Sequence, residues 1–120
     1  MNSRQKGARG ERELAGILKT VYGYAARRGQ QYSGANGDAD VVGLSGVHIE
    51  CKRVERLNLY DAMSQSRHDA RNSEMPVVMH RKNNSEWLVT LSLDDFMVLY
   101  SEWGRTEEIN EEATEHMSKL

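Results

Sequence analysis

The chain has 120 residues, a single cysteine and a formal net charge of −2. This length fits one domain, which buries roughly two-thirds of its unfolded surface and needs no disulfide or structural metal to hold a core. The lone cysteine cannot pair within the chain, no apolar run reaches the roughly 20 residues of a membrane span, and the N-terminus lacks the apolar stretch of a signal peptide. We therefore expect a soluble, cytoplasmic protein without a membrane partner.

The charge is distributed unevenly along the chain. Residues 1–82 carry 14 basic and 9 acidic side chains, a balance of +5, whereas residues 105–120 hold five glutamates against Arg105 and Lys119. A solvated basic face beside an acidic tail is a common arrangement. The asymmetry permits a nucleic-acid partner and does not by itself establish one.

Hydrophobic periodicity predicts helices and strands in the order α-β-β-β-α-β-β-α. In chain order these are a helix over 3–22, strands over 24–31, 40–44 and 47–53, a helix over 59–72, a strand opened by Pro76, a strand over 87–91, and a helix over 93–103. Ser45-Gly46 suits a tight hairpin turn, and Ser92 is a good N-cap for the last helix. The pattern leaves open whether the acidic tail is helical or disordered. The order indicates one mixed α/β domain with helices packed on a central sheet.

The strand over 47–53 carries the most informative pattern. Alternate side chains of a strand share a face, so its apolar residues, Cys51 included, should point into the core. The other face then carries His48, Glu50 and Lys52. A carboxylate and an ammonium two residues apart can hold a metal and a water together, although a solvent-facing Glu–Lys pair is the alternative for so short a motif. The sequence does not decide whether His48 touches such a site or faces solvent.

Two further carboxylates are placed near Glu50 by the predicted elements. Asp40 begins the preceding strand, and hairpin pairing brings it beside Glu50, where the two charges repel unless a cation neutralises them. Oxygen ligands of this kind suit Mg²⁺ or Mn²⁺. Glu11 falls on the shoulder of the first helix's apolar stripe, whereas Glu13 should project away from the core. Ordinary turn chemistry is the alternative for Asp40, and a favourable helix-start acid is the alternative for Glu11.

The chain resembles the PD-(D/E)XK nucleases, whose E…PD…ExK signature is matched in order by Arg9-Gly10-Glu11-Arg12-Glu13-Leu14, Gly37-Asp38-Ala39-Asp40-Val41-Val42 and Glu50-Cys51-Lys52. Over residues 4–100 it looks most like Holliday junction resolvases of the archaeal and phage type. Ala39 stands where the family usually has proline, which leaves Asp38 as a competitor, but the apolar run after Asp40 favours Asp40. The resemblance implies a single-domain restriction-endonuclease-like fold over residues 1–104, followed by an acidic C-terminal tail over 105–120.

The same resemblance implies the site and its chemistry. Hydrolysis of phosphodiesters in branched DNA would use Glu11, Asp40, Glu50 and Lys52. Asp40, Glu50 and the backbone carbonyl of Cys51 would bind Mg²⁺ or Mn²⁺, with Glu11 holding a metal-bound water or a second metal. Lys52 would orient the attacking water and stabilise the charge that develops on the phosphate.

Candidate DNA contacts are the basic residues that recur at the ends of predicted elements: Arg4, Lys6, Arg9, Arg27, Arg28, Arg53, Arg56, Arg81 and Lys82. Their scatter predicts shape-selective, salt-sensitive binding to phosphates, with ordinary surface charge as the alternative. The resemblance adds Ser33, near the scissile phosphate, and Gln65, which is equally well read as a solvent-facing helix residue.

Paired cutting by a resolvase implies a homodimer. Four residues could supply an apolar dimer surface or fill the monomer's core instead: Met63, Met97, Tyr100 and Trp103. Other readings keep the same centre in a nicking, flap or single-strand nuclease, or take the chain as an inactive DNA-binding module or a small α/β interaction protein.

Overall fold

The computed structural model describes residues 3–30 and 39–118. Its elements in chain order are α1 (Ser3–Thr20), β1 (Arg27–Arg28), β2 (Val41–Val42), β3 (Val47–Arg53), α2 (Leu59–Asp69), β4 (Met75–Arg81), β5 (Leu88–Thr90) and α3 (Leu93–Ser118). The predicted order of helices and strands and the predicted α/β class are both confirmed. None of the described helices is long and apolar enough to cross a membrane.

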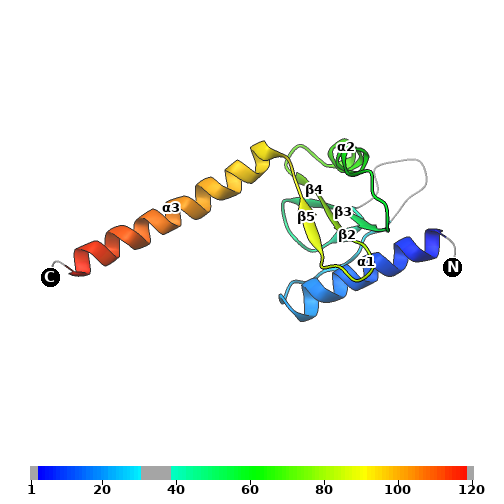
Figure 1. Ribbon diagram of the computed structural model, residues 1–120, viewed down its shortest axis with the longest axis horizontal. Coiled ribbons are helices and arrows are strands. Elements are labelled where there is room, and N and C mark those ends of the chain that lie inside the picture. Colours follow the sequence, from blue (N-terminus) through cyan, green and yellow to red (C-terminus); the bar gives the residue numbers. More distant parts are fainter. Residues whose placement is uncertain (1–2, 31–38, 119–120) are drawn as a thin grey trace.

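The five strands form one mixed sheet in the order β1-β2-β3-β4-β5, with α1 and α2 on its two sides (Figure 1). β3 and β4 are parallel over their full length, from Val47 opposite Met75 to Arg53 opposite Arg81, and the other neighbours are antiparallel. Parallel neighbours cannot be joined by a tight turn, so α2 serves as the crossover between them. The longest two strands thus form the centre of the sheet.

One face of the sheet packs against α1 through apolar residues. Leu14 and Ala15 of the helix join Ile49, Cys51 and Val77 in the main core cluster. Because Ile49 and Cys51 alternate along β3, they share this face, as the strand pattern predicts. α1 therefore covers the apolar side of the central strand.

The opposite face lies under α2 and holds polar groups as well as apolar ones. Ala62 and Met63 pack on the fully buried Val78, and the Ser66 hydroxyl donates a 2.9 Å hydrogen bond to the Val77 carbonyl. His48 and Glu50 are only 3% and 7% exposed on this side. Neither residue faces solvent, so the solvent-facing alternative that the strand pattern left open for His48 is excluded.

The first two strands are shorter than predicted. The run over 24–31 pairs only at β1, and the run over 40–44 only at β2. Gly43 has φ +126° and lies so close to Ala26 that a Cβ there would sit 2.6 Å from the Ala26 Cα. Glycine adopts this positive φ without the steric cost that other residues meet. The resulting bend of the chain at Gly43 ends regular strand pairing just after Val42. The hairpin turn nevertheless forms at Gly46, also with a positive φ.

α3 begins where predicted, with the Asp95 N–H donating to the Ser92 hydroxyl, but it does not end near Trp103. It continues to Ser118 and carries the tail away from the body, giving the molecule an extent of 65 × 31 × 27 Å. The added turns contain strong helix formers and no proline, so nothing in their composition stops the helix. The helix passes through residues 104 and 105 without a break.

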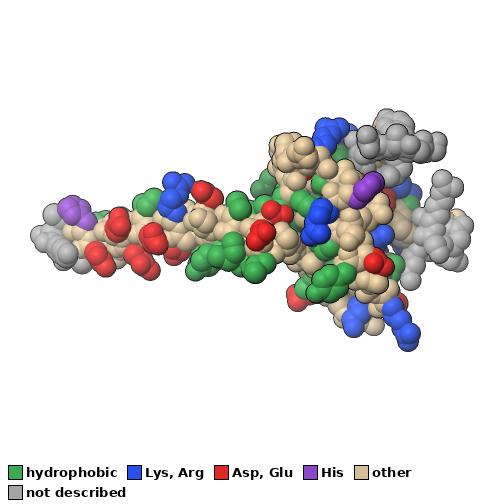
Figure 2. All heavy atoms as spheres, turned by 90° about the horizontal axis from the view of Figure 1, so that it is seen from above, with side chains coloured by type: hydrophobic (Ala, Val, Ile, Leu, Met, Phe, Trp, Pro, Cys, Tyr) green, Lys and Arg blue, Asp and Glu red, His purple; other side chains and the backbone are tan. Residues whose placement is uncertain are grey.

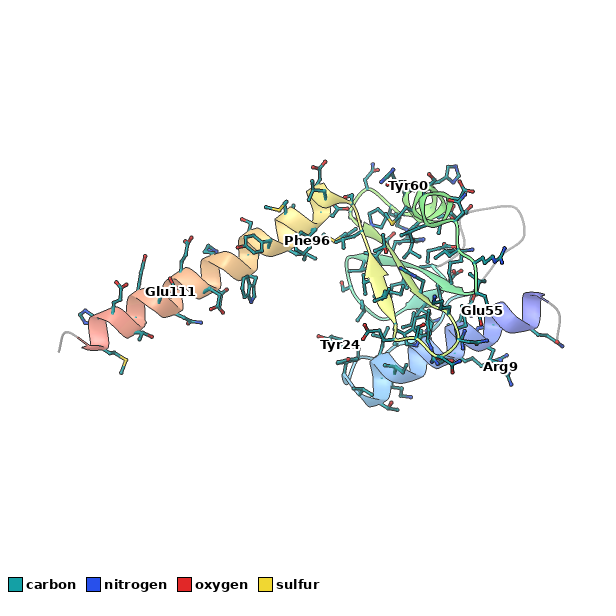
Figure 3. The ribbon with its side chains drawn as sticks, viewed as in Figure 1. Arg9, Tyr24, Glu55, Tyr60, Phe96 and Glu111 are labelled. Atoms are coloured by element: carbon teal, nitrogen blue, oxygen red, sulfur yellow. The ribbon has the colours of Figure 1, made fainter. Side chains whose placement is uncertain are left out.

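A cluster of hydrophobic side chains lies on the half of α3 nearer the body, and most of the acidic side chains lie farther out (Figure 2), where Glu111 projects from the outer part of the helix (Figure 3). Of the four residues that were candidates for a dimer surface or a core, Met63 is buried. Met97, Tyr100 and Trp103 are between 47% and 58% exposed.

Candidate functional site

The β2–β3 hairpin brings Asp40 against the central strand. The Asp40 N–H donates to the Ile49 carbonyl at 3.0 Å, and the Cys51 N–H donates to the Asp40 carboxylate at 2.9 Å. In an extended strand the N–H and C=O of one residue point to the same edge. The Cys51 carbonyl therefore also projects toward the edge of β3 that faces Asp40.

Glu50 and Lys52 share the α2 side of β3. The Lys52 ammonium lies 3.6 Å from a Glu50 carboxylate oxygen, and the Lys52 side chain is 37% exposed while that of Glu50 is 10% exposed. The stem of Lys52 thus carries its charge from the protein interior toward solvent. Asp40, Glu50 and Lys52 meet at one end of the hairpin.

The carboxyl groups of Asp40 and Glu50 are close enough to hydrogen-bond to each other. Burial and then the neighbouring Asp40 charge raise the pKa of Glu50 to about 7, with Lys52 opposing the rise. Burial also raises the pKa of Asp40, while the Cys51 N–H opposes it. Near neutral pH the pair therefore tends to hold a proton, which a divalent cation would displace.

Glu11 lies beside this pair and is held by an arginine. Its carboxylate accepts a 2.9 Å hydrogen bond from the Arg28 guanidinium. Burial raises the pKa of Glu11, Arg28 lowers it, and the charge of Asp40 raises it, which places the two carboxylates in one electrostatic neighbourhood. Arg28, expected to contact DNA, is engaged with Glu11.

Gly10 was not recognised from the sequence as part of the site's scaffold. A Cβ at this position would lie 2.4 Å from the Arg53 Cβ. The missing side chain therefore lets α1 cross the end of β3 closely enough to bring Glu11 toward Asp40. The glycine directly before Glu11 could have indicated such a close contact. A single sequence, however, does not show which of its glycines lie at close contacts.

Glu13 does not project away from the core, so that prediction is wrong. Its carboxylate accepts hydrogen bonds from Arg81 and from the Trp87 indole N–H, the latter at 3.0 Å, and lies 3.9 Å from the Arg53 guanidinium. α1 crosses the ends of the central strands, so its flank meets groups from β3, β4 and the segment before β5. A helical wheel describes one helix alone, so it cannot predict the contacts that arise where α1 crosses the sheet.

The remaining candidate DNA contacts are spread over the described surface. Arg53 also donates to Asn83, and Gln65 is exposed and donates to Asp69 at 2.6 Å. Exposed side chains among them are those of Arg9, within α1, and of Arg27, Arg56 and Lys82, at or near the ends of strands. Ser33 and the side chains of Arg4 and Lys6 lie outside the described residues.

The donor set at the hairpin fits a divalent cation. Two adjacent carboxylates and a main-chain carbonyl offer hard oxygen ligands. Burial and the neighbouring Asp40 charge raise the pKa of Glu50, and a divalent cation would offset both effects. Asp40, Glu50 and Cys51 are the residues that could hold such an ion directly. The charge of Asp40 acts on Glu11, so Glu11 belongs to the same electrostatic neighbourhood.

A mixed sheet with a parallel central pair, helices on both sides and carboxylates at a hairpin edge defines a restriction-endonuclease-like fold. The family model described as "Phage putative PDDEXK endonuclease" matches residues 2–117, and the chain belongs to this family of nucleases. The structure is similar to that of Hjc, a Holliday junction resolvase from the archaeal hyperthermophile Archaeoglobus fulgidus. The identity is 26% and the TM-score 0.53, over 69% of this chain and 74% of that one. No curated protein matches the chain.

Proposed function

We propose that this nuclease is a divalent-metal-dependent endonuclease that hydrolyses phosphodiesters in branched DNA, in the manner of a Holliday junction resolvase. The observation that carries the proposal is the meeting of Asp40, Glu50 and Lys52 at the hairpin edge. The similarity to a junction resolvase at 26% identity supports the choice of substrate. The place of action in this proposal is the interior of a phage-infected cell.

Asp40, Glu50 and the Cys51 carbonyl would hold Mg²⁺ or Mn²⁺. The ion, when bound, supplies a water of lowered pKa and neutralises charge on the phosphate. Asp40 is pre-set for this role because the Cys51 N–H fixes its carboxylate against β3. Glu11 would orient a metal-bound water or a second ion, with Arg28 holding its carboxylate in place.

Lys52 would orient the attacking water and stabilise negative charge as it grows on the phosphoryl oxygens. Its 3.6 Å contact with Glu50 keeps the ammonium at the site, and its exposure lets it reach a bound backbone. The attack is in line with the leaving oxygen. The Cys51 thiol is not the nucleophile, since it lies in the α1 core.

The proposed catalytic unit comprises residues 1–104, and residues 105–120 form an acidic extension outside it. The exposed basic residues would contact phosphates over a broad surface, giving binding that weakens steeply with salt. Paired cuts require two active sites, so the proposal includes a homodimer. Its apolar contact would use the exposed aromatic side chains of α3, where Tyr100 lies 5.7 Å from Trp103 and 6.3 Å from Phe96 between ring centroids.

The test is cleavage of a labelled four-way junction with Mg²⁺ or Mn²⁺, run beside linear duplex, nicked duplex, a flap and single-stranded DNA. Glu50→Gln should abolish cutting, while Glu86→Gln, an exposed glutamate remote from the hairpin, should leave it intact. Light scattering on the same samples gives the molar mass and tests the dimer.

Paired symmetric cuts in the junction alone would support the whole proposal. Equal cutting of a nick, a flap or single strands would keep the centre and assign it another DNA substrate. Binding of DNA without cutting under either metal would make the chain a DNA-binding module on a nuclease fold.

A further inference from the structure

A second group of possible metal ligands lies on the α2 side of β3. One ring nitrogen of His48, one carboxylate oxygen of Glu50 and one of Asp69 all lie within 4.8 Å of one another. His48 and Glu50 are two residues apart on the strand and therefore share its face. Asp69 comes from the last turn of α2, which lies over that face.

His48 is the unusual member of this group, because it is buried without full hydrogen bonding. Its side chain is 4% exposed, and its Nε2 atom has no hydrogen-bond partner among the described residues. The other ring nitrogen, Nδ1, lies 3.9 Å from a Glu74 carboxylate oxygen. Buried polar atoms are nearly always paired, so an unpaired Nε2 on a buried ring that lies close to the Glu50 and Asp69 carboxylates points to a ligand that the protein alone does not provide.

We propose that His48, Glu50 and Asp69 form a second divalent-cation position, next to the one formed by Asp40, Glu50 and the Cys51 carbonyl. Glu50 is the shared carboxylate, because it lies close both to Asp40 and to Asp69. Paired ions bridged in this way lie about 4 Å apart in two-metal sites. The imidazole ligand distinguishes the second position from the first, since nitrogen favours Mn²⁺ or Zn²⁺ over Mg²⁺.

The surroundings hold Asp69 in position for this role. Gln65 donates to one Asp69 oxygen at 2.6 Å, and the His68 ring lies 3.1 Å from the other. Each carboxylate oxygen keeps a second lone pair for a cation. Opposite ligands around an ion lie about 4.2 Å apart when each bond is about 2.1 Å, so small side-chain movements close the observed spacing.

The position is reachable from solvent. A groove of about 740 Å³ runs between the β2–β3 hairpin and the C-terminal end of α2, and both His48 and Asp69 line it. The groove gives a hydrated ion a path to an otherwise buried histidine. The proposal shares Glu50 with the proposed catalytic centre but would hold even if the chain cut no DNA.

The test is calorimetric titration of metal-free protein with Mn²⁺. The wild type should bind two ions, and Asp69→Asn should lose one of them, with affinity at that position falling roughly a hundredfold. His48→Gln should behave alike, and Asp40→Asn should lose the other ion while keeping this one. Asp61→Asn, an exposed carboxylate on the same helix, is the matched control and should bind two. Thermal melts of each variant check its fold.

Nitrogen NMR of the His48 ring during Zn²⁺ addition gives a second readout, with a large shift of Nε2 expected in the wild type and in Asp40→Asn. Two Mn²⁺ ions bound by Asp69→Asn, or an Nε2 resonance that does not respond, would overturn the proposal. If the wild type bound a single ion and Asp69→Asn lost that ion, the proposal of a cation at His48, Glu50 and Asp69 would be upheld. The same result would count against a metal at Asp40 in the proposed nuclease centre.

Discussion

The two faces of β3 differ in what their burial achieves. On the α1 side, Ile49 and Cys51 lie in an apolar core and contribute stability. On the α2 side, His48 and Glu50 are almost as deeply buried, yet one has an unpaired nitrogen and the other a pKa raised to about 7. The same strand thus stabilises the fold with one set of side chains and gives up stability with the other.

This difference indicates where the function lies. A buried carboxylate pair is costly in the absence of a cation, and such cost is retained where charge has a chemical use. The apolar face explains why the strand stays in place despite that cost. Substitutions on the two faces should therefore have opposite effects on stability and on cleavage.

Ile49→Ala should cause the largest loss of stability. The side chain is fully buried, and its removal leaves a cavity between the sheet and α1, so the free energy of unfolding should fall by about 2–5 kcal/mol. Urea denaturation measures the change. Val89→Ala, on the exposed part of β5, is the control and should stay within about 0.5 kcal/mol of the wild type. An equal loss in both variants would contradict the assignment of the core.

Lys52→Met should act on cleavage and not on the fold. Loss of the ammonium beside Glu50 removes the positive charge that would face the phosphate, so the single-turnover rate on a DNA substrate should fall about 100- to 1000-fold. The melting temperature should change little, because Lys52 is partly exposed. Lys19→Met, an exposed lysine at the end of α1, should cut at the wild-type rate. Cleavage by Lys52→Met at that same rate would remove Lys52 from the centre.

Glu50→Gln should stabilise the metal-free protein as pH rises, although we expect it to abolish cleavage. The Glu50 pKa is 4.5 when unfolded and about 7 when folded, so the folded state binds more protons between these values. Wild-type stability should therefore fall as pH rises from 4.5 through 7, by up to about 3 kcal/mol, and the glutamine variant should escape this loss. Melting curves from pH 5 to pH 8 without metal measure the difference.

Mn²⁺ should reverse that order at pH 8, since an ion that binds the folded wild type raises its stability and the variant lacks the shared ligand. A wild type whose stability is independent of pH without metal would show that the carboxyl pair does not titrate as its burial indicates.

The sequence predicted those differences between the two faces of β3 that depend on local pattern. The alternation over 47–53 placed Cys51 in the core and put Glu50 and Lys52 on one face, and the Ser45-Gly46 turn brought Asp40 to the same strand. Each of these rests on neighbours within a few residues or on a single hairpin. The resemblance to the PD-(D/E)XK signature then linked these residues into one candidate site.

The missing parts depend on how distant elements cross. Burial of His48 requires knowing that α2 folds back over β3, and the contacts of Glu13 require the angle at which α1 crosses the sheet. Asp69 meets Glu50 only once that crossover is in place. The length of α3 was underestimated because a polar stretch of good helix formers has no apolar stripe to mark it.

Cys51→Ala should have the smallest effect on stability and on cleavage. The substitution tests the side chain, which lies on the α1 face, and leaves unchanged the backbone of the same residue, which faces Asp40. The thiol belongs to the α1 core, where burial raises its pKa to about 12, whereas the backbone N–H holds Asp40 on the site side. Truncation should cost about 1 kcal/mol of stability and leave the cleavage rate within about twofold of the wild type, because the carbonyl proposed to bind the ion is kept. A large loss of cleavage with an unchanged melting temperature would mean that the side chain, and not the backbone, serves the site. In the folded wild-type protein the Cys51 thiol should also resist alkylation at pH 8, because only a small fraction of it is present as the reactive thiolate.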